Sequence, residues 1–196
     1  MTALLLAAAL LAGPAAGSGG ISLAKGPRPQ VAQLCRSARN RLDMLLPRSA
    51  DAALAQLLQE LVRSGVQVRL LLDPGYKSNR RAAAVFRKAG FKLRWLKQGQ
   101  PGDMNARLIV ADSARVLSGS FEATTASLDE RLESLAQSDD PALASDLQRQ
   151  FEAWWKKGSV KMEEGVVLDD ALEKLGDPRT DEDRTPRIKK RSSAAP

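Results

Sequence analysis

A short stretch near the middle of the chain carries polar residues at spacings typical of an active-site strand. Met104–Asp112 reads MNARLIVAD, and Leu117–Ser120 reads LSGS. Asn105 and Arg107 lie two residues apart, so a strand would place them on one face. Nucleophilic and acid–base mechanisms need a group that titrates near neutrality, and neither a carboxamide nor a guanidinium does so. The stretch therefore has the spacing of a catalytic site without an evident nucleophile.

The composition excludes several kinds of catalytic site. The 196 residues include no histidine, which rules out imidazole zinc sites, serine–histidine triads and a histidine nucleophile. The single Cys35 cannot form an internal disulfide, and we expect it to be a buried apolar residue. We expect neither a metal nor a cofactor. The net charge of +7 favours anionic partners such as nucleic acid or another polyanion.

The surrounding segments alternate between strand and helix signals. Asp112–Ala114 reads as a hairpin turn, and the region after Ser120 reads as helical, with Leu128, Leu132 and Leu135 on one face. The expected order is helix 31–39, strand 42–46, helix 49–65, strand 66–72, helix 78–90, strand 91–96, strands 107–111 and 116–118, then helices, the last beginning at Asp140 and Pro141. This order predicts one α/β domain whose mostly parallel or mixed sheet is flanked by helices on both faces.

The two ends of the chain differ in composition from the middle. Residues 1–20 read as a signal peptide or an N-terminal anchor, because the apolar run Ala3–Ala12 is shorter than the ~20 residues of a membrane span. We expect export to the periplasm, the cell envelope or the medium, with no stable membrane span in the mature chain. Residues 21–29 read as a linker, 30–157 as the folded domain, 158–175 as a helical extension and 176–196 as a disordered basic tail.

The succession of segments resembles one half-unit of the phospholipase D superfamily over about residues 30–157. It is closest to the short, nuclease-like members that carry a single motif. Gly65–Arg69 (GVQVR) and Ala89–Leu93 (AGFKL) resemble the starts of two family strands, and Phe151–Trp154 resembles the end of the closing helix. The family signature is His-x-Lys, four residues, Asp, and then Gly-Ser-x-Asn.

The resemblance implies a role for each polar position of the stretch. In the family the histidine attacks phosphorus, while lysine, serine and asparagine hold the phosphate oxygens. Asn105 stands at the histidine position, Arg107 at the lysine and Glu122 at the asparagine, whereas three positions are retained: Asp112, Gly119 and Ser120. Loss of a nucleophile removes a factor of about 10⁴ to 10⁶ in rate. The resemblance therefore predicts a relative that is catalytically inactive.

Some of these residues remain candidates for holding an anion. Arg107 can grip a phosphate with two donors, whereas Glu122 would either repel the anion or pair with Arg107. The anion-binding candidates are Arg107, Ser120, Lys77 and Arg80, and further basic residues that we expect near the site are Arg81, Arg87, Lys88, Lys92 and Arg94.

Three hypotheses follow from the sequence. The first is an inactive domain that binds nucleic acid or another anionic polymer. The second is a surviving phosphodiesterase or endonuclease that uses other groups, such as Asp103, Asp112 or Glu122 with a metal. The third is a scaffold that forms a homodimer through the motif face, as the single-motif relatives do.

Overall fold

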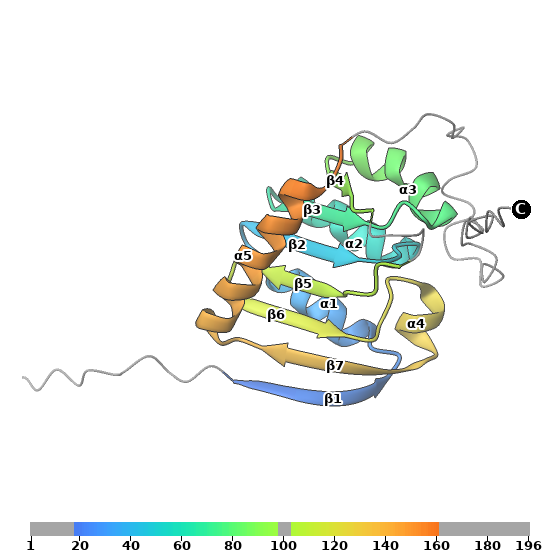
Figure 1. Cartoon of the computed structure of the whole chain (residues 1–196). Helices are drawn as coiled ribbons and strands as arrows, with labels where there is room; N and C mark the ends of the chain where they lie inside the picture. The colour runs from blue at the N-terminus through green and yellow to red at the C-terminus, as the bar shows by residue number, and fades with distance from the viewer. Residues whose placement is uncertain (1–17, 98–102, 161–196) are drawn as a thin grey trace, which may run out of the picture.

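The computed structural model describes residues 18–97 and 103–160. Seven strands form one sheet in the order β1-β7-β6-β5-β2-β3-β4 (Figure 1). The strands are β1 (Gly19–Lys25), β2 (Arg41–Leu46), β3 (Gln67–Leu72), β4 (Lys92–Trp95), β5 (Leu108–Ala111), β6 (Arg115–Gly119) and β7 (Leu132–Ser138). The helices are α1 (Arg28–Ser37), α2 (Ala52–Arg63), α3 (Lys77–Lys88), α4 (Thr125–Asp129) and α5 (Pro141–Lys157). The predicted α/β class, with a mixed sheet between helices, is confirmed.

The parallel part of the sheet consists of β2, β3 and β4, which α2 and α3 connect. β2 and β3 are almost wholly buried, as expected for apolar strands covered on both faces. α2 begins after Asp51, whose carboxylate accepts a hydrogen bond from the Leu54 N–H at 2.7 Å and so caps the helix. The strands predicted at 42–46, 66–72 and 91–96 are therefore confirmed to within two residues.

The antiparallel part begins with the hairpin of β5 and β6. Asp112 and Ser113 have φ values of 53° and 56°, which is the left-handed geometry of the tight turns that match strand twist. β5 also pairs with β2 in the antiparallel direction, so the hairpin joins the two parts of the sheet. The predicted hairpin is confirmed.

Two sequence predictions near the sheet edge were wrong. Leu132–Ser138, expected in a helix, forms β7, whose backbone pairs with β6 and β1. Residues 21–29, expected to be a linker, contribute most of β1 and the start of α1. In both cases backbone pairing with strands distant in sequence provides the hydrogen bonds that the local pattern did not indicate.

Helices cover the sheet from both sides (Figure 1). The main core lies between the sheet and α1, α2 and α3, and includes Cys35, Leu58 and Phe86. On the other face α5 packs against Leu45 and Leu71 through Phe151, which is fully buried. Each face of the central strands is thus shielded from water.

Parts of the predicted terminal segments lie outside the described residues. These are residues 1–17 of the predicted signal peptide or anchor, residues 161–175 of the predicted helical extension, and the whole predicted basic tail. Within residues 18–97 and 103–160, no helix has the length and apolar character needed to cross a membrane.

Candidate functional site

The hairpin brings the polar positions that precede β5 and follow β6 to one end of these strands, which we call the motif end of the sheet. Leu108 pairs with Ser118, so the residues that precede β5 lie beside those that end β6. The Ser118 hydroxyl donates a hydrogen bond to the Arg107 carbonyl at 2.6 Å, which joins the two segments directly. Arg107, Gly119 and Ser120 are therefore neighbours.

Arg107 is held by its neighbours within the chain. Its Nη1 donates to the carbonyl and the side-chain oxygen of Asn105, at 2.8 and 2.7 Å. Its Nη2 lies 3.3 Å from Glu122 Oε1, and the Arg107 and Glu122 side chains are only 13% and 16% exposed. The guanidinium is thus engaged in an internal ion pair, and Arg107 also lines the cavity that adjoins the start of β5.

Ser120 is bound to a carboxylate that the sequence reasoning missed. Its hydroxyl donates to Glu133 and accepts a hydrogen bond from the Ser134 N–H at 3.0 Å. Glu133 is 7% exposed and also accepts a hydrogen bond from the Ser127 hydroxyl at 2.7 Å. The sequence signal was a carboxylate between Leu132 and Leu135, two residues that we expected on one face of a helix.

Asp112 lies away from the other motif positions. It follows β5, whereas Arg107 precedes it, so the two are separated by about 16 Å at the usual rise of a strand. The Asp112 carboxylate accepts hydrogen bonds from the N–H groups of Arg39, Asn40 and Arg41 at 2.6 to 2.9 Å. Burial acts to raise the pKa of this carboxyl, but the three backbone donors outweigh it and hold the pKa below its ordinary value. Asp112 therefore supports the fold at the end of β5 opposite to the motif end.

Gly119 permits a close approach between β6 and β7. A Cβ at this position would lie 2.0 Å from the Ser134 carbonyl oxygen, which is backbone and cannot move independently. The residue is thus required by strand packing, whatever the chemistry of the site.

The other anion-binding candidates lie toward the same motif end of the sheet. α3 begins beyond the carboxyl end of β3, and β3 and β6 run in the same direction. Lys77 is exposed at the start of α3, whereas Arg80 is half-buried and donates to the Pro74 carbonyl at 2.6 Å. Within residues 18–97 and 103–160, Lys77 forms no hydrogen bond or ion pair with Arg107 or Ser120.

A cavity of about 320 Å³ adjoins the start of β5. Asn105, Arg107 and Ser118 give it a polar side, and Phe151 and Trp154 of α5 form part of its apolar side. No group of three or more histidine, cysteine, aspartate or glutamate side chains is placed to hold a metal ion within the part of the chain that the structure describes. Asp112 in particular is too distant to share a metal with Glu122.

Comparison with known proteins identifies the family. The sequence profile described as "Cardiolipin synthase, PLD-like domain" matches residues 31–155, which is more than half of the chain. The protein belongs to the phospholipase D superfamily. This phospholipase-D-like domain is 27% identical over 122 residues to the human mitochondrial cardiolipin hydrolase, covering 62% of this chain and 48% of the relative, about half of its length.

Solved structures share the fold of this phospholipase-D-like domain. Nuc from Salmonella typhimurium, a phospholipase D family member, superposes with a TM-score of 0.65 at 20% identity, covering 75% of this chain and 99% of Nuc. NucT from Helicobacter pylori superposes with a TM-score of 0.62 at 16% identity, covering 72% and 99% of the two chains. The βαβαβ core and the MNARLIVAD hairpin thus have the family architecture that the resemblance implied.

Proposed function

We propose that this phospholipase-D-like domain is catalytically inactive and serves as a binding or scaffold protein. The observation that carries the proposal is the pairing of Arg107 with Glu122 beside Asn105. Because the whole chain contains no histidine, an identical partner subunit cannot supply the nucleophile either. The internal ion pair occupies the cation that would otherwise stabilise charge on a phosphoryl group.

An assay of phosphodiester hydrolysis tests this proposal. The full chain would be incubated with bis-p-nitrophenyl phosphate and with plasmid DNA, with and without magnesium or manganese. We expect no hydrolysis above the buffer background. Turnover that disappears in Asn105→Ala or Glu122→Gln would overturn the proposal and support the alternative, a phosphodiesterase or endonuclease that uses groups other than histidine.

Binding of nucleic acid or another polyanion is the partner interaction that the charge distribution favours. α3 carries five basic residues and no acidic one: Lys77, Arg80, Arg81, Arg87 and Lys88. Lys77, Arg87 and Lys88 are exposed, and Lys77 lies toward the motif end of the sheet. Such a surface binds phosphates mainly through counterion release, so its affinity falls steeply with salt.

Fluorescence anisotropy with a labelled oligonucleotide at 50 and 200 mM salt tests this binding. We expect Lys77→Glu with Lys88→Glu to weaken binding at low salt by at least tenfold. The matched control, Arg63→Glu with Lys156→Glu, makes the same charge change at exposed positions of α2 and α5. No binding at 50 mM salt, or equal losses in both double variants, would refute a role for α3.

Two narrower features also belong to the proposal. Export of the chain rests on the leader-like composition of residues 1–20. Homodimerisation through the motif face rests on the family resemblance. Pulse labelling of full-length chain in cells, followed by fractionation, tests export, and chemical crosslinking from an introduced Asn105→Cys thiol tests the motif-face dimer.

A further inference from the structure

The strand β1 forms an open and unusually apolar edge of the sheet. It pairs with β7 on one side, and no other strand of residues 18–97 and 103–160 pairs with its outer side. Its Ile21 and Leu23 side chains are 84% and 72% exposed, and Leu132 at the start of β7 is 67% exposed. Open edges of this kind present unpaired backbone groups and form sites for pairing with another strand.

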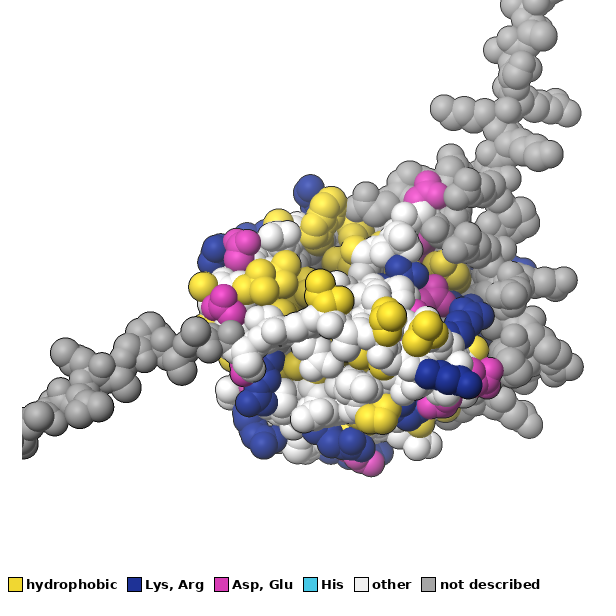
Figure 2. All heavy atoms as spheres, turned by 90° about the horizontal axis from the view of Figure 1, so that it is seen from below, with side chains coloured by type: hydrophobic (Ala, Val, Ile, Leu, Met, Phe, Trp, Pro, Cys, Tyr) yellow, Lys and Arg dark blue, Asp and Glu magenta, His cyan; other side chains and the backbone are white. Residues whose placement is uncertain are grey.

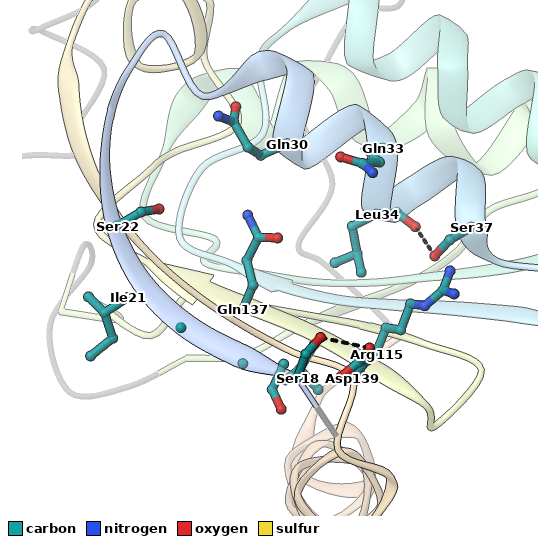
Figure 3. A pocket seen from close by; sticks show the side chains of 14 residues that line it. Ser18, Ile21, Ser22, Gln30, Gln33, Leu34, Ser37, Arg115, Gln137 and Asp139 are labelled. Carbon is teal, nitrogen blue, oxygen red and sulfur yellow. Dashed lines mark hydrogen bonds between the residues drawn. The ribbon is translucent and has the colours of Figure 1, made fainter. Parts of the chain in front are cut away.

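The two faces of the β1–β7 ribbon differ in polarity. Ser22 and Gln137 face a groove of about 590 Å³ beside α1, which Gln30 and Gln33 also line (Figure 3). Ile21 also borders this groove, but its side chain extends to the opposite side of β1 from Ser22 (Figure 3), and alternation along the strand places Leu23 on the same side as Ile21. The apolar face is therefore turned outward, to the side of the sheet that α5 covers only over the central strands.

Seen from the β1 edge, hydrophobic side chains spread across this part of the surface, with lysine and arginine side chains around them (Figure 2). Because a one-residue shift of register would reverse both faces, the pairing of β1 with β7 specifies the outward direction of Ile21 and Leu23. A strand that fits this edge must itself alternate between apolar and small or polar residues.

β1 has this pattern, and it is self-complementary. One antiparallel register pairs all seven residues of two copies, with Gly19 opposite the partner's Lys25. In this register Ile21 lies opposite the partner's Leu23 on the apolar face, and Ser22 lies opposite the partner's Ser22 on the groove face. We propose that β1 pairs with β1 of a second copy of this chain across a two-fold axis, which joins the two sheets into one.

The charges and small residues of β1 agree with this register. Each lysine lies opposite a glycine, which leaves room for its side chain and keeps the two lysines at opposite ends of the paired strands. The pairing satisfies the outer backbone groups of β1 and covers Ile21 and Leu23 in both copies. This interface uses the sheet edge, so it is distinct from the motif face and does not depend on the proposed inactivity.

Site-specific disulfide formation tests the register. In the antiparallel pair the two Ser22→Cys thiols would face each other with Cα atoms about 4.5–5.5 Å apart, within the range that a disulfide spans. The native Cys35 is fully buried and leaves the introduced thiol as the accessible one. We expect mild oxidation of full-length Ser22→Cys to give a reducible dimer in high yield, whereas the matched Ser64→Cys, exposed at the end of α2, should remain monomeric on the gel.

Sedimentation velocity of the full chain tests the interface without a crosslink. We expect a concentration-dependent dimer that Leu23→Glu weakens by at least a hundredfold, while circular dichroism stays unchanged because Leu23 is exposed. The control is Leu143→Glu, since Leu143 is a 42% exposed leucine of α5 outside the ribbon. A monomer at all concentrations, a dimer unaffected by Leu23→Glu, or equal crosslinking of the two cysteine variants would overturn the proposal. If the wild type stays monomeric but binds lipid vesicles or another protein, and Leu23→Glu abolishes that binding, then the β1 edge has another occupant and the proposal is likewise overturned.

Discussion

The Arg107 guanidinium lies 3.3 Å from the Glu122 carboxylate, and both side chains are largely buried at the motif end of the sheet. Opposite charges at this separation attract strongly where water is excluded. The pair therefore competes with any external anion for Arg107.

Removing the carboxylate of Glu122 should release Arg107 for anion binding. We expect Glu122→Gln to raise the affinity for inorganic pyrophosphate about tenfold, equivalent to about 1.4 kcal/mol. Isothermal titration calorimetry at low salt measures this change. Glu60→Gln, the same substitution at an exposed position of α2, should leave the affinity as in the wild type. Equal affinities for all three proteins would show that the ion pair does not control access to Arg107.

A side chain at position 119 should disrupt the pairing of β6 with β7. Gly119→Ala would place a Cβ 2.0 Å from the Ser134 carbonyl oxygen, so the strands must move apart. We expect a loss of about 3 kcal/mol in the free energy of unfolding, measured by urea denaturation. Gly20→Ala is the matched control, because a Cβ there meets no atom within 4 Å. A Gly119→Ala protein as stable as the control would contradict the packing argument.

Loss of Arg69 should leave a buried charge without its main partner. Arg69 donates to both oxygens of Asp43, which is fully buried, and also pairs with Glu152 of α5 at 2.6 Å. We expect Arg69→Met to cost about 3–5 kcal/mol in the free energy of unfolding, the usual effect of breaking a buried ion pair. The change also removes the stacking of the guanidinium on Phe151.

The control for this prediction is an exposed ion pair of the same type. Arg149→Met breaks the ion pair between Arg149 and Asp146, and these two side chains are 71% and 53% exposed, respectively. Its effect should lie within about 0.5 kcal/mol of zero. Similar losses in Arg69→Met and Arg149→Met would mean that burial of the network contributes little to stability.

The stabilisation that Asp112 provides should depend on pH. The folded state holds the pKa of this carboxyl below its ordinary value, so its contribution is present above about pH 4 and is lost as the pH falls further. We expect Asp112→Asn to lower the free energy of unfolding by about 2 kcal/mol at pH 7 and by much less at pH 2.5. Urea denaturation at the two pH values measures the difference. The exposed Asp146→Asn should show little effect at either pH, and an equal loss at both pH values in Asp112→Asn would contradict the role assigned to the charge.

Much of the fold could be predicted because its central strands carry strong local signals. The apolar runs of β2 and β3, and the glycines that end α2 and α3, specify a βαβαβ unit by periodicity alone. The sequence also predicted the β5–β6 hairpin, and antiparallel pairing across its short turn brings Arg107 beside Gly119.

The sheet edge could not be predicted in the same way. In β7 the leucines at 132 and 135 fit helical spacing with Leu128, and the buried Glu133 broke the expected strand alternation. Its burial is stabilised by the hydroxyls of Ser120 and Ser127, which come from other segments. In β1 the initial glycines weaken the strand signal, and only pairing with β7 supplies the missing stability.

Asp112 matches the family signature, but its position in the structure gives it a structural role. Its carboxylate fastens the first residues of β2 to the β5–β6 turn, about a strand's length from Asn105 and Arg107. This structural role of Asp112 holds whatever the chemistry of the site. One sequence signature therefore combines two separable parts, positions that close the sheet and positions that line the cavity, and the presence of Asp112 by itself does not report on turnover.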